Sequence, residues 1–130
     1  HGNAPGPTSR RVMSGLSPKG LACLLSMATL FVGNNSGPMH IAAAMGTPCV
    51  VIQGPTSANW EIFWDDVPHR IVKASHPACA PCERLSFIPG ECCNREYPHA
   101  CMNGVSVETV AGHVLEVLGC LNHLDRRVSH

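Results

Sequence analysis

The stretch from Val32 to Pro48, which reads VGNNSGPMHIAAAMGTP, constrains the fold more than any other part of the sequence. It begins as an apolar strand, passes through a polar turn and continues as a helix from about Gly37 to Met45. Gly46 stands just after that helix, where a residue in the left-handed conformation is common, and a proline follows shortly. The next segment, Cys49 to Gln53, is apolar and predicts a second buried strand. A strand, a helix and a strand in this order predict a right-handed βαβ unit with parallel strands.

The first turn of this helix is a candidate site for an anion such as phosphate. Its backbone N–H groups have no partner within the helix, and the helix dipole places roughly half a positive charge there. Glycine in this turn allows a ligand to approach the backbone closely. The candidate ligand-binding residues are Asn35, Ser36, Gly37, Pro38, Met39 and His40. A second interpretation stays open, in which Asn35 and Ser36 cap a buried helix and His40 is a satisfied core histidine.

Several other segments carry recognisable signals. Gly54 to Thr56 follows the second strand and therefore lies at the same carboxyl edge of the sheet as the candidate site, where α/β folds bind ligands. Ser17 followed by Pro18 predicts the start of a helix. Short apolar runs predict buried strands at Leu30–Val32 and Arg70–Lys73. Ser106 predicts the cap of a final helix, whose apolar positions recur at helical spacing at Val107, Val110, Ala111, Val114, Leu118 and Leu121. A loop anchored by buried aromatic side chains is predicted around Trp60, Phe63 and Trp64. Stacking of Trp60 on a nucleotide base stays open as an alternative.

The composition is that of one globular α/β domain. The chain has 130 residues, of which 45% are hydrophobic and 14% charged, so it carries enough apolar surface to bury a core. Nine basic and nine acidic residues cancel, which argues against a nucleic-acid-binding protein. No apolar run is long enough for a membrane span and no signal peptide is visible, so we expect an intracellular, soluble protein. We expect a loosely ordered lead-in at residues 1–12, a domain at 13–121 and a polar tail at 122–130.

Five of the eight cysteines gather in a proline-rich segment, residues 76–102, with few apolar side chains. The pair Cys79-x2-Cys82 is typical of a knuckle that presents two thiolates to one tetrahedral metal ion. Cys101, together with Cys92 or Cys93, would complete a four-sulfur zinc site, for which His76 and His99 are substitute ligands. Disulfides and unligated thiols are the alternatives left open. The remaining cysteines lie on apolar faces and are expected to be small core residues, namely Cys23, Cys49 and Cys120.

The run from Leu30 to Thr56 resembles the signature of glycosyltransferase family 9, the ADP-heptose:lipopolysaccharide heptosyltransferases and their relatives. The similarity extends from about Met13 to about Leu121, and the family often shows a similar cysteine pattern that ends, as here, in Cys-Met. The resemblance implies a three-layer Rossmann-like domain with a parallel sheet. It further implies the C-terminal, donor-binding half of a GT-B type enzyme with two domains. The chain departs from the family at Asn35, where the family usually carries aspartate.

The resemblance also implies a function. It points to transfer of a heptose or related sugar from a nucleotide-sugar, such as ADP-heptose, to a lipopolysaccharide core acceptor, with no cofactor required for the transfer. The catalytic base is expected in an N-terminal domain that this chain lacks, so that the chain alone is expected to be inactive. Cytoplasmic location, at the inner face of the inner membrane, would follow. Two alternatives are a nucleotide-binding module without activity and a metal-binding interaction module built around the cysteines.

Overall fold

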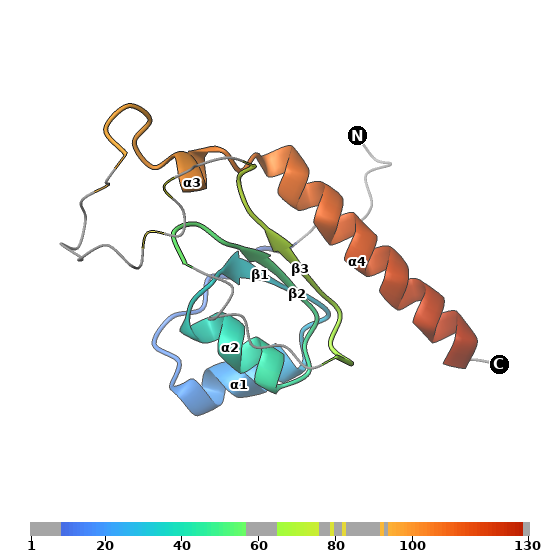
Figure 1. Ribbon diagram of the computed structural model, residues 1–130. Helices are drawn as coiled ribbons and strands as arrows, with labels where there is room; N and C mark the ends of the chain where they lie inside the picture. The colour runs from blue at the N-terminus through green and yellow to red at the C-terminus, as the bar shows by residue number, and fades with distance from the viewer. Residues whose placement is uncertain are drawn as a thin grey trace.

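A computed structural model of the chain describes residues 9–56, 65–75, 79, 82, 92 and 94–128. Within these residues, helices lie on both faces of a three-stranded parallel sheet (Figure 1). The predicted α/β fold with a parallel sheet is therefore confirmed for this part of the chain. The predictions for the aromatic loop and for two of the alternative metal ligands lie outside the described residues, at Trp60, Phe63, Trp64, His76 and Cys93.

The strands are β1 (Phe31–Asn34), β2 (Cys49–Ile52) and β3 (His69–Val72). The sheet order is β1-β2-β3, so β2 is central, and Gly33, Val51 and Ile71 are neighbours across the sheet. Each strand differs from its predicted range by one or two residues at an end. Because all three strands run parallel, the segments that follow them meet at one edge of the sheet.

Two helices precede β1 and β2 on the same face of the sheet. α1 (Pro18–Ser26) begins where Ser17 and Pro18 predicted it. α2 (Gly37–Ala44) connects β1 to β2 and ends one residue before the predicted end. Gly46 follows α2 with a positive φ of 74°, as expected of a residue that terminates a helix. The βαβ unit is therefore present as predicted.

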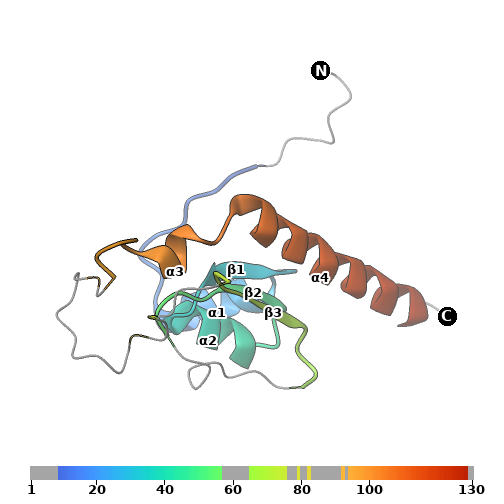
Figure 2. The ribbon, with the colours of Figure 1, turned by 45° about the horizontal axis from the view of Figure 1, so that its top comes forward.

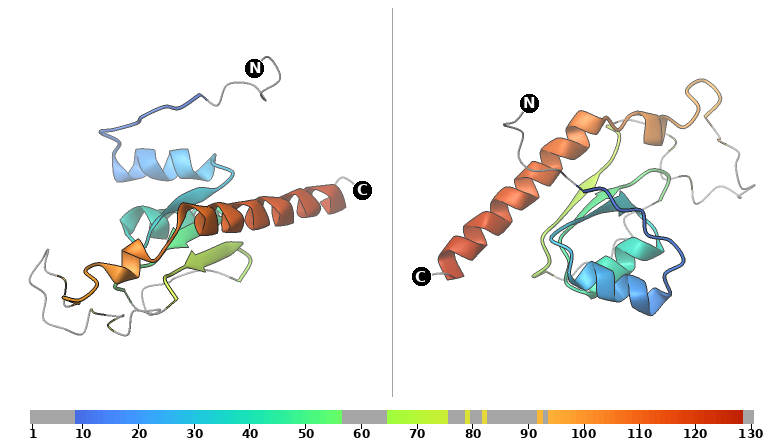
Figure 3. Two further views of the ribbon diagram at one scale, coloured as in Figure 1. Left: turned by 90° about the horizontal axis from the view of Figure 1, so that it is seen from above. Right: turned by 180° about the vertical axis from the view of Figure 1, so that it is seen from behind.

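The core consists of two layers of side chains, one on each face of the sheet. The helices that cover these layers lie on opposite sides of the sheet in the view from behind (Figure 3, right). The layer under α1 and α2 contains the buried residues Leu25, Met39, Ala42, Cys49 and Val51. The opposite layer lies under α4 (Val107–Val128) and contains the buried residues Val50, Val72 and Val117. Alternate residues of β2 thus enter opposite layers, which is the pattern expected of a strand covered on both faces.

β1 is only partly covered, contrary to the prediction of a buried strand. Its residue Val32 is 46% exposed, although Phe31 packs into the layer under α1 and α2. The reason is that α4 packs against β2 and β3, whereas β1 lies at the edge of the sheet. The start of α4 is also more open than predicted, since Val107 is 80% exposed.

The residues after Leu121, which were predicted to be a polar tail, continue α4 as far as Val128 (Figure 2). Residues 122–127 are polar apart from Leu124 and are exposed. A short helix that the sequence reading missed, α3 (Ala100–Asn103), precedes α4. No helix in the described part of the chain is both long and apolar enough to cross a membrane.

The three cysteines outside the cysteine-rich segment do not share one environment. Cys49 is fully buried in the sheet, as predicted. Cys23 and Cys120 are exposed, so the expectation that they are core residues is wrong. Both lie on helices whose other faces pack against the sheet through Leu25 and Val117, which turns the cysteines toward solvent.

Candidate functional site

The serine before α2 behaves differently from the serines before α1 and α4. Ser17 Oγ accepts a hydrogen bond from the backbone N–H of Gly20 at 3.0 Å, and Ser106 Oγ accepts one from Thr109 at 3.1 Å. Ser36 makes no such bond, and its hydroxyl instead donates to the carbonyl oxygen two residues earlier, at 3.3 Å. The expected cap from the Ser36 side chain is therefore wrong, and the first turn of α2 keeps its donors free of a side-chain cap.

Two backbone N–H groups at the start of α2, those of Ser36 and Gly37, have no hydrogen-bond partner among the described residues. The N–H groups of Met39 and His40 donate to the carbonyl oxygen of Ser36, at 3.0 and 3.4 Å, and Pro38 has no N–H. A Cβ atom added to Gly37 would meet no atom within 4 Å, so the space above it is open. The exposed backbone of Ser36 and Gly37 is thus available to an anion.

The side chains of Met39 and His40 contribute differently to this site. Met39 is fully buried in the layer between α2 and the sheet, so it holds the helix in place and its side chain is not available to a ligand. The His40 side chain is half-buried in the first turn and makes no hydrogen bond with the described residues. His40 is therefore free to hydrogen-bond a ligand.

The potential at this site is set by backbone dipoles. From Val32 to Thr56 the sequence contains no aspartate, glutamate, lysine or arginine, and Asn35 is neutral. Lys73 follows β3 directly and is exposed, so it brings a positive charge to the same edge of the sheet. The sequence predicted Lys73 within the strand, so its place at this edge of the sheet was missed. The parallel order of the strands would have indicated that place.

A side-chain hydrogen bond joins the loop after β1 to the loop after β2. Asn35 Nδ2 donates to Thr56 Oγ1 at 3.1 Å, and the Asn35 backbone N–H donates to the carbonyl oxygen of Ile52 at 3.2 Å. The prediction that Gly54 to Thr56 shares an edge with the start of α2 is confirmed. The direct role of Thr56 was missed, because the sequence does not indicate which polar side chains of two loops will pair.

The Gln53 side chain also supports the loop after β2. Gln53 is 2% exposed, and its Nε2 donates to the backbone carbonyl oxygen of Thr56 at 2.9 Å. Its Oε1 atom is buried and has no hydrogen-bond partner in the described part of the chain. A buried carbonyl oxygen without a donor costs about 1–3 kcal/mol, so this atom is suited to accept a hydrogen bond from water or from a hydroxyl group of a ligand.

The cysteine-rich segment reaches the same edge of the sheet. The backbone N–H of Cys82 donates to the carbonyl oxygen of Pro55 at 2.9 Å. The side chain of Met102, on α3, lies against Gly54 so closely that an added Cβ there would overlap its sulfur atom. Cys82 and Met102 therefore contact the loop that follows β2, which also carries Thr56.

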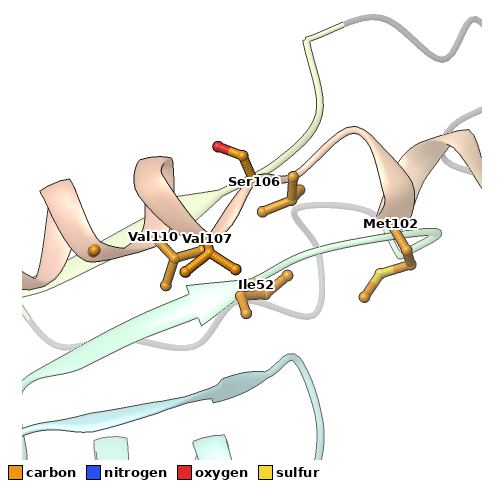
Figure 4. A pocket seen from close by; sticks show the side chains of 7 residues that line it. Ile52, Met102, Ser106, Val107 and Val110 are labelled. Carbon is orange, nitrogen blue, oxygen red and sulfur yellow. The ribbon is translucent and has the colours of Figure 1, made fainter.

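An apolar pocket of about 370 Å³ lies beside this contact, between the end of β2 and the start of α4 (Figure 4). The side chain of Ile52 enters it from the sheet, and Met102 closes one side. Since Ile52 lines this pocket together with residues of α4 and the neighbouring Val51 packs in the layer under α1 and α2, the pocket lies on the opposite side of the sheet from the α2 core layer. It is lined by Ile52, Met102, Val105, Ser106, Val107, Val110 and Ala111.

Comparison with known proteins relates a large part of the chain to a family. Residues 6–84 match the family model described as glycosyltransferase family 9 (heptosyltransferase). The chain is also similar to lipooligosaccharide heptosyltransferase 2 of Campylobacter jejuni, with 30% identity over 86 residues, which are 66% of this chain and 24% of that protein. The chain thus spans about a quarter of that relative's length. No solved structure matches the chain significantly.

Proposed function

The chain belongs to glycosyltransferase family 9, the heptosyltransferase family, and on this premise we propose that it is the donor-binding half of a two-domain enzyme of GT-B architecture. The proposed reaction is transfer of a heptose or a related sugar from a nucleotide-sugar such as ADP-heptose to a lipopolysaccharide core acceptor. The similarity to a lipooligosaccharide heptosyltransferase supports this choice of sugar and acceptor class.

The observation that carries the proposal is the uncapped first turn of α2. The unpaired N–H groups of Ser36 and Gly37, open space above Gly37 and the absence of acidic side chains together suit a diphosphate group. When an acceptor hydroxyl attacks the anomeric carbon, the bond to the diphosphate breaks and negative charge develops on the leaving group. Fixed amide donors stabilise that charge without a metal ion, and so no cofactor is needed for the transfer.

The neighbouring side chains have supporting roles in this proposal. His40 donates a hydrogen bond to a phosphate oxygen, and Lys73 adds a positive charge at the same edge. Asn35 acts by joining its loop to Thr56, which holds the start of α2 against the loop after β2. An aspartate at this position would accept a hydrogen bond from the Thr56 hydroxyl instead, so the link tolerates either residue.

Other parts of the proposed enzyme lie outside this chain. The general base and the acceptor site belong to an N-terminal domain, and the reaction takes place in the cytoplasm at the inner face of the inner membrane. The chain alone therefore binds the donor weakly and transfers no sugar. A second candidate function, a nucleotide-binding module without transfer activity, is favoured by one feature: a neutral amide stands at Asn35 where the family usually has a carboxylate.

Calorimetric titration of the full-length protein with ADP tests the proposed binding site. Gly37→Val fills the open space and blocks two charge-assisted hydrogen bonds worth about 3 kcal/mol or more together, so we expect a loss of affinity of roughly 100-fold or more. His40→Ala should weaken binding by about 1–3 kcal/mol.

Gly112→Val is the matched control, because Gly112 is exposed on α4 with open space around it. It should leave the ADP affinity unchanged. Equal affinity of the wild type and Gly37→Val for ADP would reject the site. If ADP binds as proposed but full-length protein supplied with ADP-heptose and lipopolysaccharide core transfers no sugar, the second candidate function is correct.

A further inference from the structure

Two groups of side chains have no role in the proposed function. One is the set of half-buried thiols that the sequence predicted to bind zinc, at Cys79, Cys82, Cys92 and Cys101. Among the residues that the structure describes, no three metal-binding side chains are placed to hold an ion, so the zinc site stays a prediction. The other is the buried amide of Gln53, at the carboxyl end of β2.

Gln53 is one of two polar residues that are almost fully buried in the described part of the chain, the other being Thr47. The two residues lie at opposite ends of β2 and differ in how their polar atoms are paired. The Thr47 hydroxyl donates to the carbonyl oxygen of Leu25 at 2.7 Å, which joins the loop before β2 to α1. Gln53 pairs its Nε2 atom, but its Oε1 atom has no partner among the described residues. Gln53 is therefore the costlier of the two to bury.

Gln53 connects the ends of all three strands. Its backbone N–H donates to the carbonyl oxygen of Val72 at 2.8 Å, which continues the pairing of β2 with β3 by one residue. Its Nε2 donates to the carbonyl oxygen of Thr56 at 2.9 Å and so closes the loop after β2. The Thr56 hydroxyl in turn accepts the hydrogen bond from Asn35, which follows β1 and directly precedes Ser36. A continuous path of contacts therefore runs from Gln53 through Thr56 to the start of α2.

The stability of the fold does not account for an amide at this position. An apolar side chain of equal length would leave no buried acceptor unpaired, and the preceding β2 residues Val50 and Val51 are apolar and fully buried. The one side-chain hydrogen bond of Gln53 contributes a modest net amount, whereas a buried acceptor without a donor costs as much or more. Side chains that break a packing rule in this way are expected at functional sites.

We propose that Gln53 is a positioning residue of the donor site. It holds Thr56, and through Thr56 and Asn35 it fixes the unpaired N–H groups at the start of α2 in the direction of a bound diphosphate. The inference rests on the proposed function, because it requires that the start of α2 binds the diphosphate. Donors that are already fixed bind more tightly than mobile ones, since less ordering remains to be done on binding. Gln53 therefore adds to donor affinity without adding to the stability of the fold.

Isothermal titration of the full-length protein with ADP, together with denaturant unfolding of the same samples, tests the proposal. Gln53→Met keeps the length of the side chain and removes both the hydrogen bond to Thr56 and the unpaired acceptor. We expect the ADP affinity to fall about fivefold or more, the equivalent of one neutral hydrogen bond. The denaturation midpoint should be equal to the wild-type value or higher, because the unpaired acceptor is gone.

A double variant tests whether Gln53 acts through Thr56. If both residues hold the start of α2 along one path, Gln53→Met combined with Thr56→Val should lose no more ADP affinity than the weaker-binding single variant. Independent effects would multiply instead, to about 25-fold. A loss of that size would overturn the proposal.

Thr47→Val is the matched control, because it also removes a buried polar atom, but at the opposite end of β2. It should lower the denaturation midpoint and leave the ADP affinity unchanged. If the wild type binds ADP and Gln53→Met binds it equally well, the proposal is wrong. It is also wrong if Gln53→Met loses as much stability as Thr47→Val or does not fold, since Gln53 would then be a structural residue. A wild type that does not bind ADP would instead reject the proposed function, and the positioning role with it.

Discussion

Thr56→Val removes the hydroxyl oxygen that accepts the Asn35 hydrogen bond and replaces it with a methyl group of similar size. The bond is 3.1 Å long and partly buried, and it connects the loop before α2 with the loop after β2. The hydrogen bond from Gln53 Nε2 is unaffected, because it ends on the Thr56 backbone. The substitution therefore isolates one contact between the two loops.

The expected magnitude follows from the partial burial of this pair. A neutral hydrogen bond contributes about 0.5–1.5 kcal/mol net, and water can reach part of this site, so the free energy of unfolding should fall by about 1 kcal/mol. If the contact also holds the start of α2 in its ADP-binding geometry, ADP affinity in the full-length protein should fall by roughly fivefold. Thr56→Ser keeps the hydroxyl and should therefore lower the free energy of unfolding and the ADP affinity much less.

Denaturant unfolding of wild type, Thr56→Val, Asn35→Ala and the double variant measures the contact through a double-mutant cycle. We expect a coupling energy of about 0.5–1.5 kcal/mol, because the two side chains interact directly. Isothermal titration with ADP, on the same four full-length proteins, reports the effect on binding. Effects on unfolding that add within about 0.3 kcal/mol would refute the reasoning, since unconnected sites behave that way.

Two further predictions concern packing and a buried thiol. Gly104→Ala should lower the free energy of unfolding by about 1–3 kcal/mol, because the added Cβ would lie 2.7 Å from Ala74 Cβ and 2.9 Å from the Ala100 carbonyl oxygen. The control Gly112→Ala, at an exposed position, should instead be neutral or stabilising. Equal denaturation midpoints for the two variants would contradict the close packing around Gly104. Burial raises the pKa of the Cys49 thiol from 9.0 to about 11, and its S–H donates to the Thr47 carbonyl oxygen. The folded state therefore holds this proton more tightly than the unfolded state, so stability should be constant below about pH 9 and fall by roughly 2–3 kcal/mol toward pH 11. For Cys49→Ala, the free energy of unfolding should fall less over the same pH range. An identical pH dependence of the two proteins would disprove that the Cys49 thiol causes the fall.

The local sequence determined most of the framework. Ser17 and Pro18 start α1, Gly46 ends α2, and apolar runs mark the strands, because each of these signals acts within one or two turns of the chain. The strand–helix–strand order was enough to predict parallel strands, and parallel strands were enough to bring the end of β2 next to the start of α2. The site region could therefore be predicted before any contact was known.

Tertiary packing decided what local signals leave undetermined. Three serines precede helices, yet Ser36 alone among them leaves the helix uncapped, because its hydroxyl turns to a backbone carbonyl oxygen. Val32 is half-exposed and Cys120 is exposed, since α4 covers β2 and β3 through Val117 and leaves β1 at the edge. The pairing of Asn35 with Thr56 joins residues 21 positions apart. Contacts at such separations depend on how whole elements pack against one another, which residue preferences and spacing along the chain do not encode.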